Sequence, residues 1–147
     1  MKINIEVNNQ TESPMEDSFF VSVAEKTIEA TGYEFLQDNE VSISVALVSE
    51  KEMQKLNKEY RQKDSVTDIL SFFEYETIDE IRDVPDRELF LGELILCYDD
   101  IKKYALEQDI DLQKELINVF SHGVLHLLGF AHGDEMFAIQ EGVVKTF

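Results

Sequence analysis

The sequence predicts a single α/β (α+β) domain, with about four strands in one sheet and about five helices covering it. The chain has 147 residues, a length that suits one hydrophobic core. Stretches with the two-residue alternation of strands take turns with stretches that repeat at helical spacing. No internal repeat, low-complexity segment or linker interrupts them, so we expect residues 1–147 to form one domain.

The first third of the chain predicts a strand, a helix and a second strand. Residues 1–7 alternate apolar and polar side chains, as a strand does and a signal peptide does not. Apolar residues then recur at helical spacing from about Glu16 to Thr31, where Gly32 is a natural stop. Residues 41–48 alternate again, and their second half is apolar on both faces, which predicts a buried strand.

The middle of the chain predicts a helix and two further strands. Ser49 to Glu52 match a capping box, so a helix should begin there. Residues 68–73 and 89–97 read as strands, with Gly92 marking a bulge or a close approach of another backbone. The acidic segment from Glu74 to Glu88 lacks clear periodicity, and we interpret it as a loop or flap that could gate a site.

The last third predicts three helices. Asp99 or Asp100 should cap the first of them. The strongest helical pattern runs from about Leu112 to Leu128, and a short helix should follow Gly133.

The composition limits what the protein can do. The chain has 13 Lys and Arg residues and 31 Asp and Glu residues, which gives a formal net charge of −18. This charge argues against a protein that coats nucleic acid generally. A small local basic cleft remains compatible with that charge. The lone Cys97 excludes an internal disulfide and fits a reducing cytoplasm, with Cys97 as a small core residue. No apolar run approaches the roughly 20 residues of a membrane helix, so we expect a cytoplasmic protein without a membrane partner.

All three histidines lie within one short stretch near the C-terminus. His122 and His126 are four residues apart, so a helix presents them on adjacent turns of one face. Gly129 can end that helix and let the chain fold back to bring His132 beside them. Three converging imidazoles with an open position are typical of a catalytic zinc site, whereas structural sites have four ligands. We expect one zinc ion, although imidazole also suits nickel, copper and iron.

The same helix should present two more polar side chains beside the histidines. At 100° per residue from His122, His126 falls at about 40°, Glu115 at about 20° and Asn118 at about −40°. Glu115 and Asn118 are therefore either groups that orient a ligand from behind or ordinary solvated positions. The opposite side of this helix carries its apolar stripe, which comprises Leu116, Phe120, Val124 and Leu127.

The spacing His-x-x-x-His-x-x-Gly-x-x-His is also the skeleton of the metzincin peptidases. Those enzymes carry a glutamate directly after the first histidine, as general base. This chain has Gly123 at that position, which argues strongly against peptide hydrolysis.

Three segments together resemble the YbeY family of bacterial zinc-dependent endoribonucleases that act in ribosomal RNA maturation. The similarity spans about Val41 to the C-terminus, and the N-terminal quarter agrees only in its strand–helix pattern. The family stretches are the histidine motif, the pattern Tyr-Arg-Gly-Lys-Asp-x-Pro-Thr-Asp-Val-Leu-Ser-Phe-Pro and the strand Leu-Gly-Asp-Ile-x-Ile. They match His122-Gly-Val-Leu-His126-Leu-Leu-Gly129-Phe-Ala131-His132, Tyr60-Arg61-Gln62-Lys63-Asp64-Ser65-Val66-Thr67-Asp68-Ile69-Leu70-Ser71-Phe72 and Leu91-Gly92-Glu93-Leu94-Ile95-Leu96.

The resemblance implies a fold, a substrate and partners. It implies a mostly parallel mixed sheet, with the metal site on the penultimate helix packed against it. It implies cleavage of single-stranded rRNA precursors at the 3′ end of the small-subunit RNA, a role in ribosome quality control, and contact with the small subunit or its assembly proteins. It makes His122, His126 and His132 the zinc ligands and Arg61 a functional residue of the cleft.

Several further residues of the matching segments have two readings each. Arg61 could clamp a phosphate, or it could be a surface arginine at a helix end. Lys63 could attract phosphate or be solvated. Phe72 and Phe73 could stack on bases, although core packing suits at least one of them better. Cleft and turn roles compete for Thr67, Asp68 and Ser71.

The chain departs from the family pattern at four positions. Ala131 stands where the family usually has Asp before the last histidine, which could weaken or rearrange activity. Gln62, Val66 and Phe73 replace a glycine and two prolines, which concerns the loop after Arg61. Two alternatives stay open: another zinc-dependent hydrolase, such as a metzincin-like peptidase, or a non-catalytic ribosome-assembly factor with a structural zinc.

Overall fold

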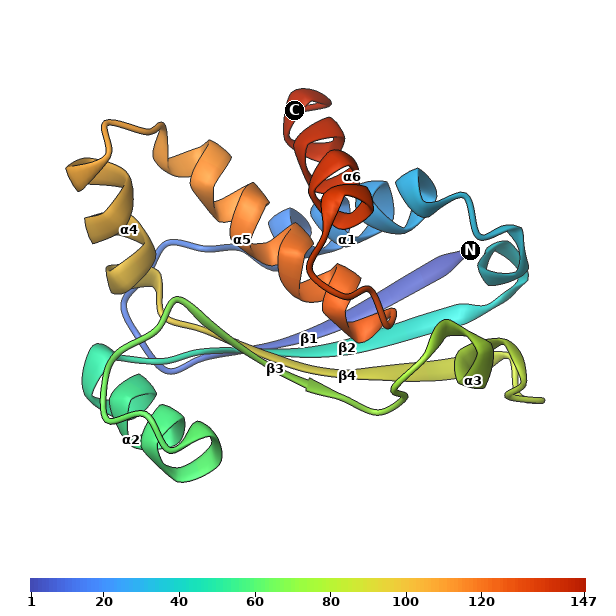
Figure 1. Ribbon diagram of the computed structural model, residues 1–147, viewed down its shortest axis with the longest axis horizontal. Coiled ribbons are helices and arrows are strands. Elements are labelled where there is room, and N and C mark those ends of the chain that lie inside the picture. The colour runs from blue at the N-terminus through green and yellow to red at the C-terminus, as the bar shows by residue number, and fades with distance from the viewer.

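A computed structural model describes residues 1–147 and contains one four-stranded sheet in the order β1-β2-β4-β3 (Figure 1). The pairs β1–β2 and β2–β4 are parallel, and β3 runs antiparallel to β4. The predicted mostly parallel mixed sheet is therefore confirmed. The strands are β1 (Lys2–Asn9), β2 (Glu40–Leu47), β3 (Ile69–Phe73) and β4 (Glu88–Leu96).

The helices cover the two faces of this sheet unequally. Figure 1 shows α1, α4, α5 and α6 on one side of the sheet and α2 on the other. The site predicted on the penultimate helix thus lies on the more thickly covered side. The helices are α1 (Asp17–Thr31), α2 (Glu50–Arg61), α3 (Ile78–Arg82), α4 (Tyr98–Glu107), α5 (Leu112–Leu127) and α6 (Asp134–Lys145), with a short 3₁₀ helix, η1 (Glu34–Asp38).

Each face of the sheet has its own core. The larger core lies under α1 and α5, where the Phe20 and Phe120 rings meet edge to face with centroids 4.9 Å apart. The smaller core lies under α2 and includes Ala46, Met53 and Leu70. Because β2 supplies both cores, its second half is buried on both faces, as its apolar pattern predicts.

Local capping signals determine where several helices begin and end. Gly32 ends α1 with φ 74°, in the left-handed region where glycine carries no Cβ penalty. The Ser49 side chain accepts the Glu52 backbone N–H at the start of α2, as the capping box predicts. Asp111 caps α5 in the same way through the Lys114 N–H.

Two predictions about helices are wrong. Helix α4 begins at Tyr98 directly after β4, with buried Cys97 at the cap position, so Asp99 and Asp100 lie in the first turn and do not cap it. There they still interact favourably with the helix dipole. Helix α3 interrupts the segment predicted as a loop, and its one buried residue, Ile81, is too little for a visible period.

Gly92 allows β3 and β4 to approach each other. The β2–β4 register shifts here, because Ser42 pairs with Phe90 whereas Ile43 pairs with Gly92. Gly92 has φ 139°, and a Cβ on it would lie 2.2 Å from the Phe72 carbonyl oxygen. Both the bulge and the close backbone approach predicted at this glycine are therefore present.

Candidate metal centre and its cleft

Helix α5, which carries His122 and His126, packs closely against the sheet at Gly123. A Cβ on Gly123 would lie 2.6 Å from Ile69 Cδ1 and 3.0 Å from Leu94 Cδ2, so only glycine lets the helix pack this closely. The buried Ser121 hydroxyl is also 3.1 Å from the Thr27 hydroxyl of α1. The two histidines are therefore displayed from a backbone fixed on both sides.

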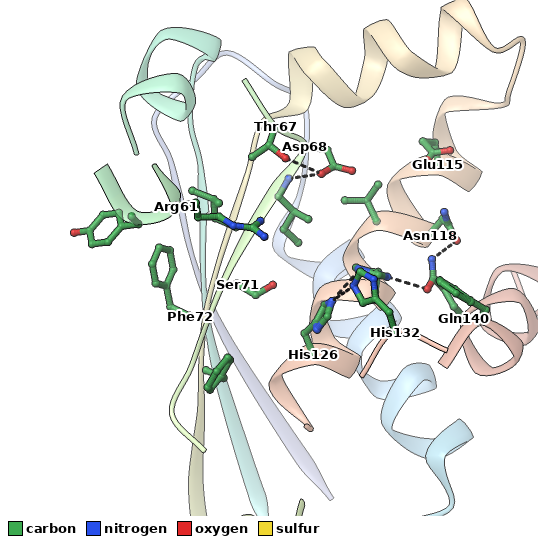
Figure 2. Close-up of a pocket in the computed structure, with 17 residues that line it drawn as sticks. Arg61, Thr67, Asp68, Ser71, Phe72, Glu115, Asn118, His126, His132 and Gln140 are labelled. Carbon is green, nitrogen blue, oxygen red and sulfur yellow. Dashed lines mark hydrogen bonds between the residues drawn. The ribbon is translucent and has the colours of Figure 1, made fainter. Parts of the chain in front are cut away.

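The turn after α5 brings the third histidine to the other two. Gly129 adopts φ 89° and donates its N–H to the His126 carbonyl oxygen, and the chain reverses there. The Nε2 atom of His126 lies 3.0 Å from that of His122 and 2.8 Å from that of His132 (Figure 2). Three imidazole nitrogens that converge in this way fit a metal ion, and because His132 is exposed the site opens to solvent.

Gln140 of α6 orients His122 from behind. Its Oε1 lies 3.1 Å from His122 Nδ1, and its amide nitrogen donates to Asn118 Oδ1 at 2.7 Å. His122 then carries its proton on Nδ1 and turns the Nε2 lone pair toward the other histidines. Asn118 thus reaches His122 through Gln140, whereas Glu115 lines the cleft without a hydrogen bond to any histidine.

The central histidine is disposed to stay neutral. The pKa of His126 is lowered to about 4, chiefly by burial and then by the charges of His122, His132 and Arg61. At neutral pH its imidazole therefore has a free lone pair, which a metal ligand requires.

Arg61 faces the histidines from the opposite wall of a cleft of about 780 Å³. It is the last residue of α2, which ends because Gln62 takes a left-handed conformation with φ 58°. Its side chain is exposed and points across the cleft toward the histidine side (Figure 2). The predicted candidate Lys63 does not line this cleft, and Arg61 is its one Lys or Arg side chain.

Thr67, Asp68 and Ser71 line the cleft beside Arg61. The Asp68 carboxylate accepts the Ile69 N–H at 2.8 Å and lies 3.4 Å from the Thr67 hydroxyl, so these two residues build the turn into β3. Figure 2 shows the Ser71 side chain pointing into the cleft, with no hydrogen bond drawn to another residue.

The aromatic residues that line the cleft have separate roles. Phe72 packs against the smaller core and meets the Tyr60 ring edge to face at 5.2 Å, so its position is structural. Tyr60, Phe72 and Phe73 all line the cleft on the Arg61 side, and Phe137 of α6 lines it on the histidine side. Sequence reasoning missed Phe137 and Gln140, because both come from α6 and reach the site only through tertiary packing.

Ala131, the main departure from the family pattern, lies just outside the cleft. It is exposed and borders a smaller hollow with Tyr33 and Gly129.

Comparisons with known proteins agree with this geometry. The family model described as Endoribonuclease YbeY matches residues 5–147. The chain belongs to the YbeY family. The match begins well before Val41, so membership extends further toward the N-terminus than the three motifs indicated.

Curated relatives and a solved structure resemble the chain over most of its length. The Endoribonuclease YbeY of Oceanobacillus iheyensis is 32% identical, covering 99% of this chain and 97% of the relative. That of Finegoldia magna is 36% identical, covering 89% and 82%. The solution structure of a Thermotoga maritima protein has a TM-score of 0.64 at 29% identity, covering 97% of this chain and 87% of that one.

Membership of the YbeY family makes this chain an enzyme, a hydrolase that acts on RNA phosphodiester bonds. The three histidines could hold a metal ion for that reaction. No helix is both long and apolar enough to span a bilayer.

Proposed function

We propose that this protein is a cytoplasmic, zinc-dependent endoribonuclease that cleaves single-stranded rRNA precursors. Its role would be to mature the 3′ end of the small-subunit RNA and to act in ribosome quality control, with residues 1–147 as one metallohydrolase domain. The observation that supports this best is the pairing of three converging imidazoles with Arg61 across one open cleft.

In this proposal the metal would be held by His122, His126 and His132, whose Nε2 atoms converge. Zinc bound there would act as a Lewis acid and lower the pKa of a bound water to about 7. Three ligands beside an accessible cleft favour a catalytic site over a structural one, since structural zinc takes four protein ligands. Gln140 keeps His122 in the tautomer that binding requires.

Arg61 binds and orients the phosphodiester. Its planar guanidinium can donate two parallel hydrogen bonds to the non-bridging phosphate oxygens and stabilise the charge that develops on them. Ser71 projects into the same space and can donate a further hydrogen bond to the RNA. Thr67 and Asp68 hold the turn that carries this wall, and Lys63 contributes only long-range attraction.

The charges that line the cleft support a role for a divalent cation. Arg61 is the one Lys or Arg, whereas Asp68 and Glu115 are both carboxylates, so without an ion the formal balance is negative. An RNA backbone segment with two phosphates carries two negative charges, and this net negative charge would repel it. A divalent ion at the histidines reverses its sign, which couples RNA binding to metal binding.

The charge of the whole chain favours an RNA that is presented by a partner. With a formal net charge of −18, the protein should bind naked RNA weakly and with marked salt sensitivity. We therefore propose that the small ribosomal subunit or its assembly proteins deliver the substrate.

The peptidase alternative loses its remaining support at Gly123. That position is closed by Ile69 and Leu94, so a glutamate there would enter the sheet packing and could not serve as general base. The assembly-factor alternative rests on Ala131, which lacks the carboxylate that the family pattern has.

The test compares chelator-treated and zinc-reconstituted protein on a small-subunit rRNA precursor, both naked and within small ribosomal particles. We expect internal cleavage that requires metal, spares a duplex control and is faster on particles. Cleavage that survives chelation would contradict the metal site. Zinc-loaded protein that binds particles without cutting RNA would favour the assembly factor.

A further inference from the structure

Two half-exposed phenylalanines lie on the two walls of the histidine cleft. Phe73 is 53% exposed at the end of β3, and Phe137 is 49% exposed on α6. Neither ring belongs to the larger or the smaller hydrophobic core. Single exposed apolar residues are common on protein surfaces, but two rings that face one polar metal cleft need a more specific explanation.

Phe137 faces the cleft because of its phase on α6. The buried stripe of this helix is Met136, Gln140 and Val143, at intervals of four and three residues. Phe137 follows Met136 by one residue and so projects about 100° away from that stripe. Its ring centroid lies 6.2 Å from that of His132, at the mouth of the candidate metal centre.

Phe73 faces the cleft because of its phase on β3. Ile69 belongs to the larger core on the helix-covered face, whereas Leu70 and Phe72 pack on the α2 face. Alternation then turns Phe73 toward the same face as Ile69 and the histidine helix. Phe73 stands where the family pattern has proline, so this ring adds an aromatic surface that the motif does not include.

We infer that Phe73 and Phe137 form a stacking subsite for unpaired nucleobases of the RNA, an inference that rests on the proposed function. Aromatic rings bind bases of any sequence through their faces, and a base in a duplex is not available for such contact. The subsite would supply affinity that the single cleft arginine of this acidic chain cannot supply through phosphate contacts. It would also make the enzyme prefer single strands.

The test measures binding of short single-stranded RNAs that carry the fluorescent base 2-aminopurine at successive positions, with the RNA checked to be intact afterwards. Stacking on a ring quenches this fluorophore. We expect quenching at one or two adjacent positions with wild-type protein. Phe73→Leu and Phe137→Leu should each weaken binding about tenfold and abolish quenching at one position, with zinc affinity unchanged. Phe137→Tyr keeps an aromatic ring at this position, so it should retain wild-type binding and quenching.

Phe90→Leu is the matched control. Phe90 is 46% exposed and lies on β4 between Leu89 and Leu91, which belong to the larger core, so its ring points to the opposite face. Its replacement should leave binding and quenching unchanged.

Four outcomes would overturn the inference, the last of them together with the proposed function. Wild-type affinity and quenching in both leucine variants would remove the subsite, even if cleavage is normal. A loss of zinc affinity in Phe137→Leu would make that ring a support for His132. Equal affinity of wild type for duplex and single strands would also contradict it, whereas a wild type that neither binds nor cuts RNA would remove the proposed function as well.

Discussion

The two walls of the cleft are built in different ways. The histidine wall comes from α5 and α6, where buried Gln140 and half-buried Asn118 support His122 through a chain of hydrogen bonds. The opposite wall comes from the end of α2 and the start of β3, where Arg61 is exposed and local turn chemistry sets the backbone. The histidine wall is therefore suited to holding metal ligands rigidly. The Arg61 wall is suited to adapting to a flexible RNA. Substitutions on the two walls should therefore have different consequences.

The largest effect should come from His126→Ala, which removes the central imidazole of the histidine wall. Its Nε2 lies within 3.0 Å of both other histidine Nε2 atoms, so two ligands should not retain the metal. We expect zinc content to fall to background, the zinc-dependent rise in melting temperature to disappear and cleavage to fall by more than about 10³-fold. Metal analysis, thermal melts and gel assays measure these. One equivalent of retained zinc would show that His126 is not a ligand.

Arg61→Ala tests the other wall and should separate catalysis from metal binding. Because Arg61 is exposed, its loss should leave zinc content and melting temperature unchanged, while cleavage slows by about 10²–10³-fold. Lys55→Ala makes the same charge change on an exposed residue of α2 that does not line the cleft, and it should cleave normally. An equal slowing by both variants would mean that Arg61 contributes only general charge.

The same contrast explains what could be predicted from the sequence. The i, i+4 histidine pair, the stop at Gly129 and the caps at Ser49 and Gly32 are local signals, because each depends on residues within one or two turns. They located the histidine wall and the elements that carry it. The glycine at position 92 was also informative, since a strand glycine often marks a close approach.

The undetected features depend on contacts between distant segments. Gln140 meets His122 across 18 residues, and nothing in the local pattern of α6 identifies a buried glutamine as a partner of a histidine. Helix α3 is held by Thr77 and the single buried Ile81, so it has no period to detect. Asp99 and Asp100 looked like caps because both residue types favour that position, but the strand runs directly into α4.

Gln140→Leu should give the next largest effect and tests whether the histidine wall depends on its support. Leucine approximates the volume of glutamine but cannot accept the His122 Nδ1 proton, so zinc affinity should fall by about 10–100-fold. Gln140→Glu keeps a hydrogen-bond acceptor for His122 Nδ1, so its zinc affinity should fall less. Gln113→Leu, on an exposed position of α5, controls for the loss of a glutamine. Competition with a fluorescent chelator measures the affinities, and unchanged zinc affinity in Gln140→Leu would exclude the supporting role.

A smaller effect should appear in the pH dependence of metal-free protein. Burial lowers the pKa of His126 to about 4 in the folded chain, below the ordinary histidine value of about 6.5, so the unfolded chain binds this proton more readily. Stability from this group is therefore complete above about pH 6.5 and is lost as the pH falls toward 4. Because His126 is only half buried, we expect the unfolding free energy of wild type to fall by about 1 kcal/mol more between pH 7 and 4.5 than that of His126→Gln. Urea unfolding in chelator measures the difference, and parallel pH profiles would contradict it.

The smallest effect should come from Ala131→Asp, which restores the family carboxylate just before His132. Ala131 is exposed and borders the hollow that Asp134 and Glu135 also line, outside the histidine cleft. A carboxylate there would meet like charges and would not reach the bound RNA, so zinc affinity and cleavage rate should stay within about twofold of wild type. A rate increase of tenfold or more would contradict this placement. The loop before His132 would then have to turn residue 131 into the cleft during the reaction, and the site would need a third, mobile wall.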